Sequence, residues 1–153
     1  MSTRSRIGIQ IGSDVLSVYH HWDGYPTWLG KVLNTHYNSK EKVAELIDGG
    51  DMSSCWSDSI WGDKLPEGEY APEYYSARGE NCPPVLMSKN EYLTKDNNEE
   101  YAYIYHNGEW ECYNMNEFND FLTQNITPNE NISSVKTAFV IKNTKKLGNV
   151  PLD

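Results

Sequence analysis

Alternating apolar and polar residues open the chain and predict a β-hairpin over 5–11/14–20. Three isoleucines in the first of these segments are each separated by one residue, which places them on one face of a strand. The pair Gly12-Ser13 suits a two-residue turn that needs glycine in its first position. Pairing across this turn sets Ile9 opposite Leu16, so the apolar faces of both strands coincide.

The same alternation orients the end of the second strand. If the strand reaches residue 20, His20 faces the core and His21 faces the opposite side. Asp23-Gly24 then favours a turn, and Pro26 suits the first position of a helix. We therefore expect a strand, a turn and a helix start to meet at residues 20–28.

Two helices are predicted after this corner. Leu29, Val32, Leu33 and His36 follow the spacing of one helix face over 26–37. A second helix over 40–48 has Ser39 as its N-cap and glycines at its end. Residues 51–88 carry scattered Trp and Tyr without a clean period, so we expect short edge strands there.

A second hairpin is predicted over 100–105/109–113. Its turn is Asn107-Gly108, the preferred pair of a type I′ turn, and its register places Tyr105 opposite Trp110. A helix over 115–124 follows, and 133–142 suits a last strand or a last helix. Together these elements predict one α+β domain over 1–153, with antiparallel hairpins packed against short helices and with mobile tails at 1–5 and 148–153.

Composition narrows the classes of partner. The 153 residues include 13 Lys and Arg against 22 Asp and Glu, a net charge of −9. Nucleic-acid binders normally carry a basic surface, so we expect no direct binding to DNA, RNA or anionic membranes. An acidic surface suits solubility, a basic protein partner, or a protein that imitates phosphate charge. The three cysteines lack a C-x-x-C spacing, and no apolar run reaches the length of a signal or membrane segment, so we expect a cytoplasmic protein.

The run His20-His21-Trp22-Asp23-Gly24-Tyr25-Pro26 holds the main candidates for chemistry. His20, His21 and Asp23 are metal-ligand types, but neighbours on a strand point to opposite faces, so we expect no metal and no cofactor. An imidazole oriented by Asp23 could act as a general acid or base, although no nucleophile elbow or phosphate loop accompanies it. Trp22 and Tyr25 could line a ligand pocket or anchor a protein partner. A purely structural role explains every residue type except the paired histidines.

Further candidates for ligand binding lie outside this run. Arg78 and Glu80 flank a glycine, and arginine presents a planar fork to a carboxylate or a phosphate. The alternative for this pair is a surface turn with a local ion pair. Asp51 follows two glycines and could bind or cap, but its surroundings lack the lysine and the glycine pattern of a phosphate loop.

Several segments also carry a resemblance: His20–Pro26 followed by Leu29-Gly30, Glu45–Asp51 with Ser53-Ser54, Tyr74–Glu80, and Gly108–Trp110. They resemble a family of small uncharacterised proteins of tailed bacteriophages, including cyanophages, and the match covers most of residues 5–122. The family has no established activity, so the resemblance implies a genomic setting. Small acidic proteins in that setting commonly resemble host-takeover factors or inhibitors of bacterial defence, and these usually act by binding.

Two hypotheses follow. The first is a non-enzymatic binding module with its site at residues 20–28, joined by Arg78, Glu80 and Asp51, whose partner is a host protein or a small nucleotide-like ligand. The second is a small hydrolase or nucleotide-modifying enzyme that uses a His/Asp acid–base pair. Convergence of the imidazoles, Asp23 and Arg78 on one concave pocket favours a ligand site or an enzyme. If Trp22 and the imidazoles are instead buried and satisfied by the backbone, only a surface-interaction role remains. The sequence determines neither the partner nor the oligomeric state.

Overall fold

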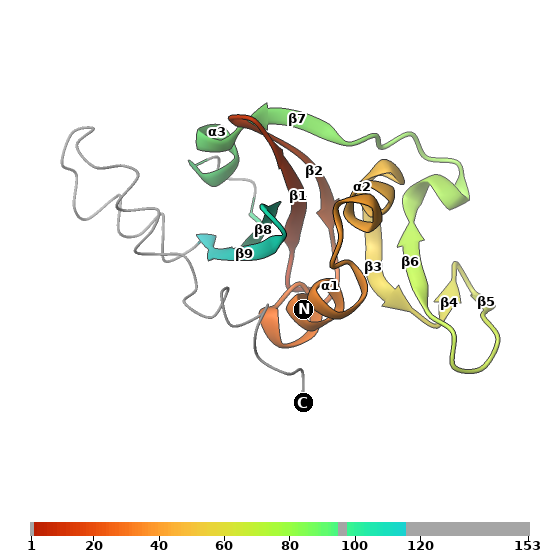
Figure 1. Ribbon diagram of the computed structural model, residues 1–153. Helices are drawn as coiled ribbons and strands as arrows, with labels where there is room; N and C mark the ends of the chain where they lie inside the picture. The colour runs from red at the N-terminus through yellow and green to blue at the C-terminus, as the bar shows by residue number, and fades with distance from the viewer. Residues whose placement is uncertain (1, 95–97, 116–153) are drawn as a thin grey trace.

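A mixed β-sheet organises the computed structural model of the chain, which describes residues 2–94 and 98–115 (Figure 1). Its strand order is β6-β3-β2-β1-β8-β9, and β7 pairs with β2. The pairs β1–β8 and β2–β3 are parallel, and the other pairs are antiparallel. The strands of this sheet are β1 (Ser5–Ile11), β2 (Asp14–His20), β3 (Met52–Ser57), β6 (Ala71–Tyr74), β7 (Val85–Ser88), β8 (Tyr101–His106) and β9 (Glu109–Asn114).

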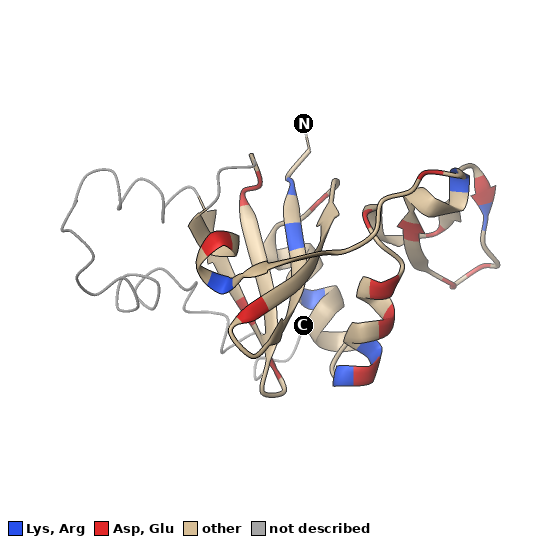
Figure 2. Ribbon diagram, turned by 90° about the horizontal axis from the view of Figure 1, so that it is seen from above, with Lys and Arg blue, Asp and Glu red and all other residues tan. Residues whose placement is uncertain are grey.

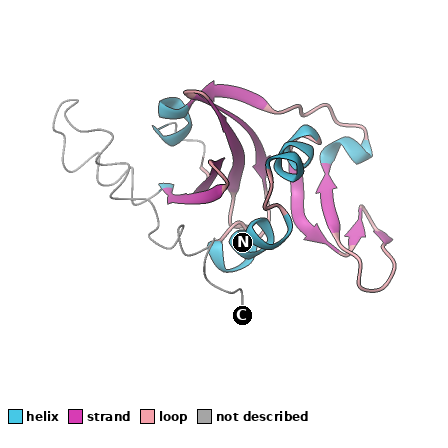
Figure 3. Cartoon of the chain, in the orientation of Figure 1, coloured by secondary structure: helices cyan, strands magenta, loops and turns pink. Residues whose placement is uncertain are grey.

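Five helical segments and a small separate hairpin complete the described fold. The hairpin joins β4 (Ser59–Ile60) to β5 (Asp63–Lys64). The helical segments are the π-helical turn η1 (Pro26–Gly30), α1 (Lys31–His36), α2 (Lys40–Asp48), the 3-10 turn η2 (Tyr75–Arg78) and α3 (Lys89–Thr94). The predicted α+β class is confirmed, and residues 51–88 do form short strands (Figure 3).

Both predicted hairpin registers are confirmed. Ile9 lies opposite Leu16, and Tyr105 lies opposite Trp110. Asn107 and Gly108 have φ of +52° and +79°, as the central positions of a type I′ turn require.

The two predicted helices that lie within the described residues are also present. Residues 26–36 are helical as η1 followed by α1, and α2 covers 40–48 with the Ser39 hydroxyl accepting the N–H of Lys42. One residue departs from its predicted side. His36 was expected on the buried face of its helix, but it is exposed and stacks on Trp56 with ring centroids 3.9 Å apart.

The two faces of the sheet are covered differently. On one face η1, α1 and α2 bury an apolar core against β1, β2 and β8. On the other face Tyr92 and Leu93 of α3 pack against Val15 and Ile104. Tyr19 and His21 lie on this second face toward the opposite end of β2, and both are only half-buried.

The N-terminal segment is held by the fold. It was expected to be a mobile tail through residue 5, but Ser5 is fully buried and the carbonyl of Thr3 accepts the N–H of Gly24 at 2.8 Å. This contact ties the segment to the corner at residues 20–28. The predicted helix over 115–124, the last element over 133–142 and the tail at 148–153 lie almost entirely outside the described residues.

Charged residues of both signs are spread over the described ribbon. Figure 2 shows Lys and Arg interspersed with Asp and Glu on helix α2 and on the β4–β5 hairpin. Within the described part of the chain, no helix is long and apolar enough to cross a bilayer.

Candidate functional site

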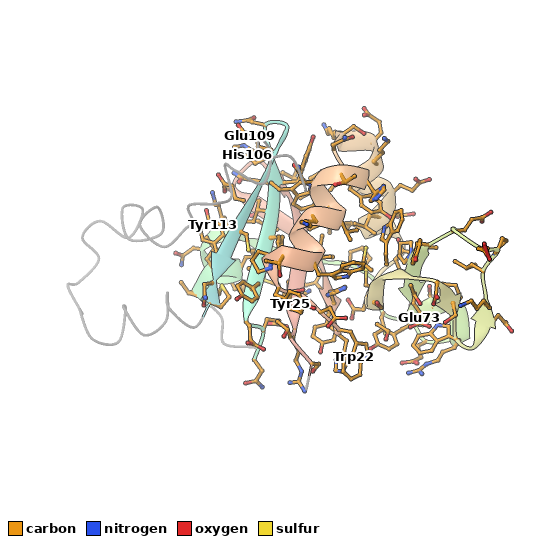
Figure 4. The ribbon with its side chains drawn as sticks, turned by 90° about the horizontal axis from the view of Figure 1, so that it is seen from below. Trp22, Tyr25, Glu73, His106, Glu109 and Tyr113 are labelled. Carbon is orange, nitrogen blue, oxygen red and sulfur yellow. The ribbon has the colours of Figure 1, made fainter. Side chains whose placement is uncertain are left out.

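The corner at residues 20–28 divides into a buried part and an exposed part. His20 is fully buried, whereas Trp22, Tyr25 and Trp28 expose 44%, 37% and 38% of their surface. Figure 4 looks onto this end of the molecule and labels Trp22 and Tyr25. We call His21, Trp22, Tyr25 and Trp28 the aromatic corner.

His20 has a structural role. Its Nε2 accepts the backbone N–H of Cys55 at 3.0 Å, so its proton is on Nδ1, which lies 3.1 Å from the Ser5 hydroxyl. Burial lowers the pKa of His20 to about 3, with a further contribution from His21. Because this imidazole is neutral, enclosed and hydrogen-bonded at both nitrogens, it is removed from the acid–base candidates.

His21 faces away from the core, as the strand alternation predicts. Its Nδ1 lies 2.7 Å from the Tyr19 hydroxyl, and its ring meets Trp22 edge-on with centroids 4.7 Å apart. The N–H of His21 donates to Met52 and that of Trp22 donates to Ser53, so pairing with β3 orients both side chains. The two histidines are consecutive in sequence, but His20 lies in the core and His21 lies beside Tyr19 and Trp22.

The turn residues are explained by the fold. Asp23 has a φ of +56°, a conformation that aspartate tolerates better than most residues. Gly24 is buried, and its carbonyl accepts the Tyr103 hydroxyl at 2.8 Å. Pro26 begins η1. Within the described residues, no hydrogen bond joins Asp23 to an imidazole, so the predicted His/Asp pair is not assembled.

Asp51 caps an interruption in the strand pairing. On the outer edge of β2, β7 pairs with Asp14–Ser17, and β3 begins to pair only at His20. Between them the Asp51 Oδ1 accepts the N–H of Tyr19 at 2.9 Å. Of the two roles considered for Asp51, capping is the one that the structure displays.

Tyr19 and Tyr75 connect the corner with the region of Arg78. Burial raises the pKa of Tyr19. The positive charge of Arg4 lowers this pKa, and the nearby Tyr75 raises it. Burial also raises the pKa of Tyr75, while a hydrogen bond with Ser53 and the charge of Arg78 lower it. The Tyr75 N–H donates to the carbonyl of Asp51 at 3.2 Å, and the Asp51 carboxylate accepts the N–H of Tyr19, so Asp51 joins the two tyrosines.

Arg78 stacks on aromatic rings. Its guanidinium carbon lies 4.1 Å from the ring centroid of Trp61 and 5.2 Å from that of Tyr75. Its Nε forms an ion pair with Glu80, because Gly79 turns the chain back with a φ of +92°. We call Trp61, Tyr75, Arg78 and Glu80 the arginine clamp.

The ion pair of the clamp was among the alternatives predicted from sequence, but the aromatic platform was missed. The available signal was the Trp61-Gly62 pair, a glycine-containing turn in a segment rich in aromatic residues. What the sequence did not reveal is that Arg78, seventeen positions later, returns to this turn.

The structure brings some of the predicted site residues into one series of neighbours and separates others. Trp22, His21 and Tyr19 follow one another through a ring contact and a hydrogen bond. Asp51 joins Tyr19 to Tyr75 by two hydrogen bonds, and the Tyr75 ring lies beside the guanidinium of Arg78. His20 lies apart in the core, and the described residues contain no group of three His, Cys, Asp or Glu arranged to hold a metal ion. Searches with the whole chain match no protein-family model, no curated protein and no solved structure.

Proposed function

We propose that this protein is a non-enzymatic binding module that recognises a protein partner through the aromatic corner. One observation carries the proposal: three large aromatic side chains within seven residues, Trp22, Tyr25 and Trp28, are 37% to 44% exposed. Exposed aromatic clusters commonly mark interaction sites, and Trp and Tyr are the usual anchors of protein interfaces.

Some residues of the 20–28 corner maintain the fold and others do not, and this difference supports the proposal. His20, Gly24 and Pro26 are engaged in hydrogen bonds, close packing or the start of η1. The fold uses Trp22 and Tyr25 in no comparable way, because neither side chain forms a hydrogen bond with another described residue. The cost of exposing these rings is offset if a partner covers them.

Binding is better supported than catalysis. The enzyme hypothesis required an imidazole oriented by Asp23, and that contact does not form among the described residues. A protein partner is better supported than a nucleotide-like ligand. The chain has a net charge of −9, which disfavours a phosphate group.

The biological setting that we propose is that of a bacteriophage accessory protein in the cytoplasm of an infected bacterium. The resemblance of His20–Pro26 and Tyr74–Glu80 to the bacteriophage family supports this setting. In it, the protein binds a host protein for host takeover or against a defence system.

Affinity capture with matched variants tests the proposal. The tagged full chain, Trp22→Ala and the control Tyr70→Ala are incubated with a panel of bacterial lysates that includes cyanobacterial ones, and bound proteins are quantified by mass spectrometry. Tyr70 is 48% exposed but belongs to the His36–Trp56 stack and not to the corner, so it matches Trp22 in exposure. We expect Trp22→Ala to reduce capture of a specific protein about tenfold and Tyr70→Ala to leave it unchanged.

The result that overturns the proposal is equal capture by both variants, or no protein captured above background from any lysate. Thermal unfolding provides the folding control. Since Trp22 and Tyr70 are 44% and 48% exposed, Trp22→Ala and Tyr70→Ala should both unfold cooperatively and lose similar amounts of stability.

A further inference from the structure

The guanidinium of Arg78 is fixed in place before any partner arrives. It lies over Trp61 and Tyr75, whose ring centroids are 5.6 Å apart, and its Nε is paired with Glu80. An arginine held on aromatic rings loses less side-chain freedom on binding than a free surface arginine does. The clamp is therefore a preorganised cation at the protein surface.

The platform under Arg78 is built at a conformational cost. Trp61 has a φ of +47° and Gly62 a φ of +95°, the signs of a type I′ turn, in which asparagine is normally preferred at the first position. A bulky residue with positive φ is uncommon, and such residues concentrate at functional sites. Two hydrogen bonds hold Trp61 there: its N–H donates to Glu73 and its indole N–H donates to the carbonyl of Tyr74, both at 2.8 Å.

The ion pair with Glu80 uses only one side of the guanidinium. Glu80 meets Nε, and among the described residues no carboxylate or carbonyl accepts a hydrogen bond from the two terminal amino groups of Arg78. Those two groups form the end-on fork that binds a carboxylate or a phosphate with two parallel hydrogen bonds. The Arg78 side chain is 48% exposed, so a group in solution can reach it.

Charge selects between these two anions. Arg78 and Glu80 cancel, and Asp51 adds a further negative charge within electrostatic reach of Tyr75. The net charge of −9 on the chain repels a phosphate dianion more than a singly charged carboxylate, and a clamp whose charges cancel does not offset this repulsion.

We propose that the terminal amino groups of Arg78 bind a carboxylate of the protein partner. This inference rests on the proposed function, because hydrogen bonds link the clamp to the aromatic corner. The Tyr75 N–H donates to the carbonyl of Asp51 at 3.2 Å, and the Asp51 carboxylate accepts the N–H of Tyr19. The Tyr19 hydroxyl in turn lies 2.7 Å from Nδ1 of His21. The partner then presents an acidic side chain or a chain terminus to the clamp and an apolar side chain to the corner.

A titration followed by NMR tests this assignment. The full chain labelled with ¹⁵N is titrated with N-acetylphenylalanine, which has one ring and one carboxylate, and with the corresponding amide, which lacks the charge. The signals observed are the Nε–H of Arg78 and the indole N–H of Trp61. We expect the acid to shift both signals saturably and the amide to shift the Arg78 signal at least about fivefold less.

Two variants and a third probe sharpen the result. Arg78→Gln should abolish the saturable shift of the Trp61 signal. The control Lys64→Gln, which removes a positive charge from the adjacent β4–β5 hairpin where Lys64 pairs with Asp58 at 3.0 Å, should leave it intact. Equal shifts from acid and amide, unaltered binding by Arg78→Gln, or tighter binding of phenyl phosphate than of the acid would each overturn the inference.

The outcomes also separate this inference from the proposed function. In the capture experiment we expect Arg78→Gln to weaken partner binding about tenfold, or about 1.4 kcal/mol, and Lys64→Gln to leave it unchanged. If Trp22→Ala abolishes capture and Arg78→Gln does not, the result supports the aromatic corner as the recognition surface and contradicts the carboxylate site at Arg78. If the acid binds through Arg78 but Trp22→Ala captures the partner normally, the result supports the clamp as a carboxylate site. It contradicts the proposal that the corner is the recognition surface.

Discussion

The Nε2 atom of His20 accepts the backbone N–H of Cys55 at 3.0 Å, so a histidine side chain takes the place that a strand carbonyl would otherwise fill. The contact joins the end of β2 to the middle of β3, 35 residues away. It requires an unprotonated Nε2, and the fold therefore depends on the neutral imidazole.

The first prediction concerns pH. Since the pKa of His20 is lowered from 6.5 to about 3 in the folded chain, the unfolded chain binds this proton first as pH falls. The contribution of neutral His20 to stability is fully present above pH 6.5 and is lost toward pH 3. We expect a loss of about 2 kcal/mol between pH 6.5 and 5, measured by urea unfolding at several pH values.

The control for this prediction is His20→Gln, whose side-chain oxygen can accept the same N–H without titrating. This variant should lose about 2 kcal/mol less than the unaltered chain over that pH interval. Parallel pH dependence of the unaltered chain and His20→Gln would show that folding does not change proton binding at His20, which contradicts the prediction.

The second prediction concerns Asp51. Asp51→Ala removes the acceptor of the Tyr19 N–H, and we expect it to lower the free energy of unfolding by about 1–3 kcal/mol. Asp51→Asn keeps an oxygen acceptor and should cost less. The Tyr19 amide should exchange with deuterium faster in Asp51→Ala, whereas Asp58→Ala, which breaks only the exposed pair with Lys64, should leave that rate unchanged. Slow exchange at Tyr19 in Asp51→Ala would contradict the capping role.

The third prediction concerns Gly24. A Cβ at this position would lie 2.5 Å from the Ser5 hydroxyl and 2.7 Å from the carbonyl of Thr3. We expect Gly24→Ala to destabilise the fold by about 1–3 kcal/mol through overpacking. Gly12→Ala is the comparison, because its Cβ would meet nothing within 4 Å and only the positive φ adds a cost of about 1 kcal/mol. A Gly24→Ala protein as stable as the unaltered one in chemical denaturation would refute this packing argument.

The fourth prediction concerns Tyr103. Its hydroxyl donates to the buried carbonyl of Gly24 at 2.8 Å, across 79 residues of sequence. Tyr103→Phe leaves this carbonyl without its donor and should lower the free energy of unfolding by about 1 kcal/mol. Tyr25→Phe removes a hydroxyl from a 37% exposed ring and should change it by less than about 0.5 kcal/mol. Equal effects of the two variants in urea unfolding would argue against a role for this hydrogen bond.

Much of the local structure could be predicted because neighbouring residues determine it. The register Ile9–Leu16 follows from alternation across a short turn, and the start of α2 follows from the Ser39 cap. The sequence also separated His20 from His21, since successive strand residues point to opposite faces.

The pairing of distant strands could not be predicted in the same way. Nothing in Val85–Ser88 specifies β2 as its partner, and nothing in β1 specifies the parallel pairing with β8. Many pairings satisfy the same alternation, and the choice among them depends on how all elements pack together.

At residues 20–28, too, local structure could be predicted from the sequence and long-range contacts could not. The sequence by itself determined the order of strand, turn and helix at residues 20–28 and the side of the strand to which each histidine belongs. Only the tertiary structure decided what these residues do. Ser5 and Cys55 form hydrogen bonds with the buried His20. Asp51, the residue before β3, accepts the N–H of Tyr19, and the guanidinium of Arg78 lies over the Trp61 ring. Each of these roles depends on atoms that are distant in sequence and become neighbours only when the sheet assembles.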